Sequence, residues 1–118
     1  MYSEPQTDFR AAFQLPVTPS TGPTDQVVRL ISRHKNIPAP MILSASRCRV
    51  NVARARQLAM YLAHVILGES LTAIGHAFGR DRTTVSYACA LIEDLRDDPA
   101  FDAAVTDLEL ELQNEALQ

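Results

Sequence analysis

The apolar positions between residues 70 and 95 repeat with the period of a helix and are interrupted once, by a glycine. Leu71, Ile74 and Phe78 are spaced three and four apart, which predicts a short helix with one apolar face. Gly79 is predicted to end this helix, because glycine takes positive φ at little cost, and Asp81 is predicted to cap a second helix. The apolar side of the second helix comprises Val85, Ala88, Cys89, Ile92 and Leu95, and its other side Arg82, Thr83, Ser86 and Tyr87. A short helix, a glycine turn and a helix with an Arg-Thr leading end are typical of a helix-turn-helix that reads DNA.

Apolar periodicity predicts further helices before this pair. Thr24 is a candidate N-cap for a helix that ends at Asn36, and Pro40 is placed to open a one-turn helix. The three apolar residues of that turn are expected to be buried: Met41, Ile42 and Leu43. A longer helix is predicted over residues 53–67, with Gly68 closing it and a broad apolar face formed by Leu58, Tyr61, Leu62, Val65 and Ile66.

The last predicted helix covers residues 99–115, with Asp98 as its cap and Pro99 in its first turn. Its apolar residues recur every four, three and four positions, at Phe101, Val105, Leu108 and Leu112. Such a seam packs either on the core of the same chain or on a second copy. A monomer and a weak homodimer are therefore both compatible with the pattern, and the whole chain is predicted to be a small all-α helical bundle.

Residues 1–23 contain four prolines and no sustained period, which predicts a disordered N-terminal arm before a single domain over residues 24–116. Within this arm Phe9, Phe13 and Leu15 are either a short docking motif or incidental.

Charge is distributed unevenly, although the formal net charge is only −3. Residues 26–68 contain seven Arg or Lys side chains and no acidic one, whereas residues 93–118 contain nine acidic side chains and the single basic residue Arg96. The asymmetry indicates either a nucleic-acid face with an acidic tail or two solvated faces of opposite sign.

Several function classes find no support in the composition. Glycine occurs only at positions 22, 68, 75 and 79, so there is no Gly-rich phosphate loop, and no histidine has a catalytic spacing to a nucleophile. The potential zinc ligands Cys48, Cys89, His34, His64 and His76 are too far apart in sequence for a metal site. We therefore expect no enzyme activity, cofactor or metal. With no signal peptide, no long apolar run and no Cys-x-x-Cys, we expect reduced thiols and a cytoplasmic, nucleoid-associated protein without membrane contact.

Arginines cluster around the start of the long predicted helix. Arg54, Arg56 and Gln57 lie at its leading end, where the helix dipole favours anions, so they are predicted to clamp a phosphate. The polar loop predicted over residues 44–52 holds Arg47 and Arg49, which either enter a minor groove or belong to an ordinary solvated loop.

The segment Val52-Ala-Arg-Ala-Arg-Gln-Leu-Ala-Met-Tyr-Leu-Ala63, followed by Ile74-Gly-His-Ala-Phe-Gly-Arg-Asp-Arg-Thr-Thr-Val85 and Ala88-Cys89, closely resembles the C-terminal DNA-binding domain of the bacterial chromosomal replication initiator DnaA. The resemblance covers about residues 25–115 and implies a Trp-repressor-like helix-turn-helix fold. It implies that Asp81, Arg82 and Thr83 read bases in the major groove. The backbone would be held by Thr84, Arg56 and Gln57, with Ser86 on the same polar side, and Arg47 or Arg49 would serve the minor groove.

This sequence departs from the family pattern Gly-Gly-Arg-Asp-His-Thr-Thr-Val. Only Gly79 remains of the glycine pair, so the turn is one residue shorter, and Arg82 replaces the family histidine. Ala55 replaces a proline, and Ala90-Leu91 stands where the initiator has basic residues. The first two changes are expected to alter base choice, and the last to weaken binding generally. The 118 residues also leave no room for the initiator's nucleotide-hydrolysing part.

Two functional hypotheses follow. The first is a sequence-specific double-stranded DNA-binding protein, without ATPase activity, that regulates chromosomal replication initiation or transcription. The second is a protein-interaction module with the same fold that modulates the initiator or other replication-initiation proteins without strong DNA binding. The shortened turn, the lost basic pair and the net acidity motivate the second hypothesis.

Overall fold

The computed structural model describes residues 22–44 and 50–116, and helices account for most of them. In chain order these helices are α2 (Pro23–Lys35), α3 (Ala39–Leu43), α4 (Val50–Val65), α5 (Leu71–Phe78), α6 (Arg82–Leu95) and α7 (Pro99–Ala116). The described part of the chain contains no strand, which confirms the all-α prediction. None of its helices is both long and apolar enough to pass through a membrane.

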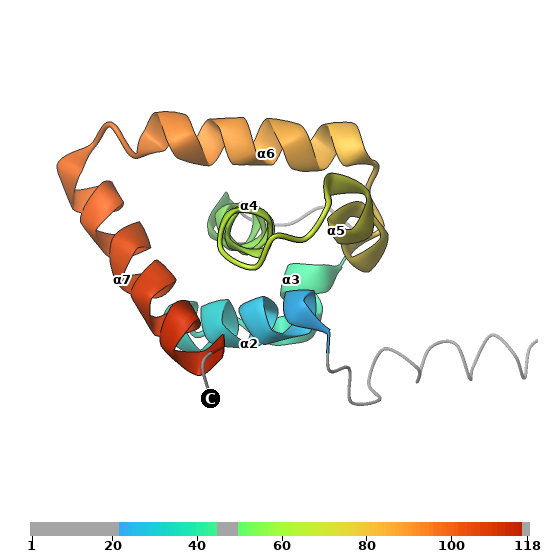
Figure 1. Ribbon diagram of the computed structural model, residues 1–118, viewed down its shortest axis with the longest axis horizontal. Helices are drawn as coiled ribbons and strands as arrows, with labels where there is room; N and C mark the ends of the chain where they lie inside the picture. Colours follow the sequence, from blue (N-terminus) through green and yellow to red (C-terminus); the bar gives the residue numbers. More distant parts are fainter. Residues whose placement is uncertain (1–21, 45–49, 117–118) are drawn as a thin grey trace, which may run out of the picture.

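The core is built around α4, which Figure 1 shows nearly end-on in the middle of the molecule, with α6 on one side and α2 on the other. Helix α4 has apolar side chains toward both α2 and α6, and Leu58, Ala59 and Leu62 are almost wholly buried. Residues from every other helix complete this core, among them Ile31, Ile42, Ile74, Phe78, Val85, Ile92, Val105 and Leu112. A helix buried on most of its circumference is apolar nearly all round, and α4 fits that description.

The first helix begins two residues earlier than predicted. Its N-cap is Gly22 and Pro23 lies in its first turn, a position that suits proline because the missing N–H has no helical partner there. The prediction of Thr24 as the cap was therefore wrong; Thr24 is inside α2 and only 8% exposed. At the other end Asn36 adopts the left-handed conformation at φ 57°, as expected for a helix that stops there.

The segment around α3 and α4 also differs from the prediction. Ile42 is fully buried, but Met41 is 45% exposed rather than buried, because a single helical turn presents only one side to the core. Helix α4 starts at Val50, three residues before the predicted start, and ends at Val65, two before the predicted end. The predicted loop over residues 44–52 is thus helical from Val50 onward, and its residues 45–49 lie outside the described part of the chain.

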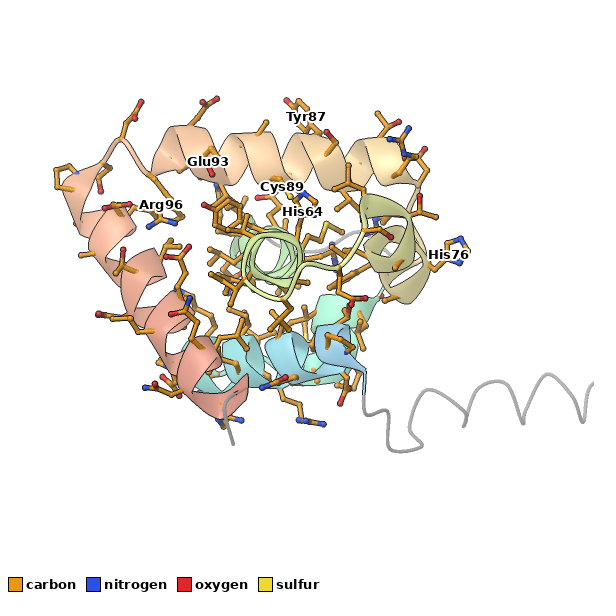
Figure 2. All side chains as sticks on the ribbon, viewed as in Figure 1. His64, His76, Tyr87, Cys89, Glu93 and Arg96 are labelled. Atoms are coloured by element: carbon orange, nitrogen blue, oxygen red, sulfur yellow. The ribbon has the colours of Figure 1, made fainter. Side chains whose placement is uncertain are left out.

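Helix α7 packs on the core of its own chain, since Val105, Leu108 and Leu112 are all buried there. Asp98 caps it as predicted, its Oδ2 accepting a hydrogen bond from the Phe101 N–H at 2.9 Å. Arg96 then fastens the helix at the corner where α7 leaves α6 (Figure 2). Its guanidinium, 17% exposed, donates to Asp102 at 2.6 Å, Glu109 at 2.8 Å, Thr106 at 3.0 Å and the Tyr61 hydroxyl at 3.0 Å. Two of the nine acidic residues of the C-terminal part thus pair with Arg96 within the fold, and the Glu109 side chain is only 17% exposed.

Candidate nucleic-acid interface

The turn between α5 and α6 brings the two helices into close contact. Ser70 caps α5, accepting from the Ala73 N–H at 3.0 Å, and Gly79 ends it at φ 67°, as predicted. Gly75 is buried where the turn folds back, and a Cβ on it would lie 2.5 Å from the Arg80 carbonyl oxygen. The Arg80 N–H donates to the Gly75 carbonyl at 2.8 Å. Sequence reasoning missed the role of Gly75, although a glycine inside a helix of eight residues was the available signal.

Asp81 caps α6, as predicted. Its Oδ1 accepts a hydrogen bond from the Thr84 N–H at 2.9 Å. Hydrogen bonds to Thr84, with a further one to Thr83, lower the pKa of Asp81 below its usual value, so the carboxylate is charged at neutral pH. The negative charge lies at the positive end of the helix dipole, which adds to the stability of the cap.

Helix α6 presents its polar side to solvent. Arg82, Thr83 and Ser86 are all exposed, while Val85, Ala88 and Ile92 face the core, which agrees with the division predicted from the sequence. Cys89 and Leu95, predicted on the buried side, are only partly buried. Burial is the main cause that raises the pKa of the Cys89 thiol, which is therefore protonated at neutral pH. The exposed side changes character toward the C-terminal end, where Glu93 and Asp94 are exposed and Asp97 and Asp98 follow.

A hollow of about 200 Å³ lies between the leading half of α4 and α6. It is lined by Ala53, Arg56, Gln57, Met60, Arg80, Thr84, Tyr87 and Ala88. The fold thus gathers Arg56, Gln57 and Thr84, three of the residues predicted to hold a DNA backbone. Among the described residues the buried Gln57 Oε1 has no hydrogen-bond partner, and the same holds for Nη1 of the neighbouring Arg54.

Arg56 is far more buried than a surface phosphate clamp, at 6% exposed. Its Nε donates to the Ile42 carbonyl at 2.7 Å and its Nη2 to the Met41 carbonyl at 3.0 Å. These bonds tie α4 to α3 and give Arg56 a structural role that the sequence did not reveal. Its predicted contact with a phosphate stays a prediction. Arg47 and Arg49, predicted for the minor groove, lie outside the described residues.

The basic residues of the N-terminal half do not form one face. Helix α2 lies across α4 from α6 (Figure 1). Two of its arginines have acidic partners there: Arg29 pairs with Asp25, and Arg33 pairs with Glu115 of α7 at 2.7 Å. On the α6 side the cations lining the hollow or the exposed helix face are Arg56, Arg80 and Arg82. The charge asymmetry was compatible with a nucleic-acid face or with two solvated faces of opposite sign. The ion pairs of α2 agree with the second interpretation for this helix.

The histidines do not gather at this interface. His76 projects into solvent from α5 (Figure 2), and Nδ1 of the exposed His64 lies 2.9 Å from the Glu69 carbonyl oxygen. Within residues 22–44 and 50–116, no three His, Cys, Asp or Glu side chains form a group suited to a metal ion.

A capped short helix, a left-handed glycine turn and a second capped helix with an exposed polar leading end together define a helix-turn-helix DNA-binding domain. Residues 24–92 match the family described as bacterial dnaA protein helix-turn-helix, and the chain belongs to that family.

Curated relatives agree with this assignment. The chain is 42% identical over 80 residues to the chromosomal replication initiator protein DnaA of Acinetobacter baumannii strain ATCC 17978, and 40% identical to that of Acinetobacter baylyi strain ADP1. Each match covers 66% of this chain but only 17% of the relative. The chain therefore corresponds to about a sixth of the length of these initiators.

Proposed function

We propose that this protein binds double-stranded DNA in a sequence-specific manner and regulates chromosomal replication initiation or transcription. The observation that carries the proposal is the exposed leading half of α6, next to a hollow that collects Gln57 and Thr84. In a helix-turn-helix the leading residues of the second helix meet base edges, while neighbouring groups hold phosphates. The name of the relatives, chromosomal replication initiator, supports the link to replication.

The proposal assigns four exposed side chains of this half a role suited to their chemistry: Arg82, Thr83, Thr84 and Ser86. Arg82 forms two hydrogen bonds to the O6 and N7 edge of a guanine, and Thr83 packs its methyl group against a thymine. Asp81 lies beside them and keeps its capping bond to Thr84. Thr84, Ser86, Gln57 and Arg56 hold the backbone, with Arg47 or Arg49 in the minor groove.

Replacing Arg82 tests this function. Arg82→Ala is expected to weaken binding to the preferred duplex by roughly 1–3 kcal/mol and to relax one base position, because a bidentate contact to guanine is lost. Selection of bound duplexes from a random library gives the preferred site, and fluorescence anisotropy at several salt concentrations gives the affinity. Wild-type protein that binds no duplex at low salt, or an Arg82 variant that selects the same site with the same affinity, would contradict the proposal.

One observation favours a second candidate, a module that binds replication-initiation proteins. Glu93 and Asp94 are exposed near the C-terminal end of α6, and Ala90 is exposed at the position where the initiator has a basic residue. Absence of DNA binding at low salt, together with direct binding of purified chromosomal initiator, supports this candidate. Box-selective and salt-sensitive DNA binding without initiator binding excludes it.

A further inference from the structure

Tyr87 is the largest side chain on the exposed side of α6, and nothing described so far accounts for it. It is 73% exposed and points away from the centre of the molecule in Figure 2. It also lines the hollow between α4 and α6, beside Gln57, Arg80 and Thr84. Its side chain therefore starts at the hollow and extends into the solvent that DNA would occupy.

On α6, Tyr87 lies between Thr83, four residues before it, and Thr84, three residues before it, and it differs from Thr83 in lining the hollow. Thr84 and Tyr87 are three residues apart, so they share the flank of α6 that faces α4, and both line the hollow. Thr83 and Ser86 are also three apart and share the outward side, and neither lines the hollow. A duplex that receives Thr83 in its major groove brings the groove's phosphate wall to the flank of Thr84 and Tyr87.

The chemistry of this flank is that of an oxyanion site with few charges. Arg56 already donates from Nε and Nη2 to two carbonyls of α3, and Ala90-Leu91 stands where the family has basic residues. Arg80 lines the same hollow, and the hydrogen bonds of its guanidinium to described residues are long, at 3.4 Å to the Phe78 carbonyl and 3.5 Å to the Ser44 carbonyl. A phenol supplies one O–H donor without charge, which a phosphate oxygen accepts well.

We propose that Tyr87 is a DNA-backbone contact, whose hydroxyl donates a hydrogen bond to a phosphate at the α4–α6 hollow. The inference rests on the proposed DNA-binding function and adds a residue to it. Because the hydroxyl is neutral, its contact displaces no counterion and contributes nothing to the dependence of affinity on salt. Because phosphates carry no sequence, the contact strengthens binding to every duplex equally.

The test compares Tyr87→Phe, which removes only the hydroxyl, with wild type and with Gln113→Ala, an exposed control on α7. The probes are two short duplexes of equal length, one containing the box bound by the chromosomal initiator and one of scrambled sequence. Tyr87→Phe is expected to bind both duplexes roughly threefold to tenfold more weakly, with an unchanged slope of log affinity against log salt. The Gln113 variant is expected to bind as wild type does.

A second variant distinguishes the hydroxyl from the ring. If Tyr87→Phe binds like wild type while Tyr87→Ala is weak, the ring makes the contact and the inference is overturned. It is also overturned if the loss falls on the box duplex alone, because Tyr87 then reads a base, or if neither variant differs from wild type. If wild-type protein binds neither duplex, the proposed function itself fails.

Discussion

At the scale of single residues, Arg56 illustrates how burial changes the meaning of a charged side chain. Its place at the leading end of α4 predicts a phosphate contact, yet Nε and Nη2 are bound to the carbonyls of Ile42 and Met41. A buried acceptor that loses its donor pays the desolvation penalty of an unmade hydrogen bond. Arg56 therefore affects the fold whether or not it also meets DNA.

Arg56→Ala is expected to lower the free energy of unfolding by about 1–3 kcal/mol, because the Ile42 carbonyl then lacks its buried donor. Urea denaturation followed by circular dichroism measures the change. Arg29→Ala serves as the matched control, since the Arg29–Asp25 pair is largely exposed and such pairs contribute at most about 1 kcal/mol. Equal stability of the two variants would show that Arg56 does not hold α3 against α4.

At the scale of elements, the angle between α5 and α6 depends on two glycines with different tasks. Gly79 provides the left-handed residue that ends α5, and no neighbouring atom crowds it. Gly75 has ordinary helical geometry but lies against the Arg80 carbonyl, so it is the absence of a side chain that matters there. The contact between α5 and α6 is kept only while both conditions hold.

Gly75→Ala is expected to destabilise the domain by about 1–3 kcal/mol, because a Cβ 2.5 Å from the Arg80 carbonyl oxygen forces the backbone of the turn to move. Helix propensity alone would favour alanine by roughly 0.5–1 kcal/mol, so the sign of the change reports the close contact. The same variant is expected to lose DNA affinity while still folded, because α6 is re-aimed. Thermal unfolding and anisotropy titration measure the two effects.

Gly79→Ala and Gly68→Ala form the matched controls for that experiment. Both glycines have positive φ, at 67° and 72°, and an added Cβ has open space at each. Each variant is expected to lose roughly 1–2 kcal/mol, the usual cost of a left-handed alanine. A Gly75 variant as stable as wild type would contradict the close contact.

Apolar patterns and end signals such as proline, glycine and aspartate identified every helix of the described chain. Gly79, Asp81 and Asp98 are such signals, and all three act as predicted. The predictions failed where contacts between residues far apart in sequence determine a helix end or the role of a side chain. The α4 start at Val50 and the Gly22 cap of α2 were missed because short-range signals locate helix ends poorly. At the site, the exposed side of α6 was predictable, whereas the bonds of Arg56, the contact at Gly75 and the hollow join residues far apart in sequence.

At the scale of the whole molecule, Arg96 links three helices. Arg96 is the C-cap residue of α6. Its guanidinium donates hydrogen bonds to Tyr61 of α4 and to three residues of α7, which are Asp102, Thr106 and Glu109. Hydrogen bonds to Glu109, to Asp102 and to Tyr61 raise the pKa of Arg96 above its usual value, so the charge is permanent. Burial is the main cause that raises the pKa of the Tyr61 hydroxyl, which is protonated at neutral pH. The guanidinium of Arg96 therefore helps to hold α7 against the core.

Arg96→Met is expected to reduce the free energy of unfolding by about 3 kcal/mol, near the low end for a buried pair because Asp102 is half exposed. The methionine fills a similar volume but leaves the Glu109 carboxylate without its partner. Arg33→Met, at an exposed pair with Glu115, is expected to cost at most about 1 kcal/mol. Urea denaturation gives both values, and hydrogen exchange locates the loss in α7. Equal costs would show that the Arg96 network adds little.

The change of charge along α6 has a consequence for how the domain meets a duplex. Arg82 lies at one end of the helix and the exposed Glu93 and Asp94 lie toward the other, so the charge gradient runs in the same sense as the helix dipole. In the proposed complex, phosphates attract the end of α6 that carries Arg82 and repel the end that carries Glu93 and Asp94. Encounters in which the acidic end arrives first are therefore disfavoured, and those led by the Arg82 end are favoured. A single copy of this domain would accordingly read a site that has a direction rather than a palindrome.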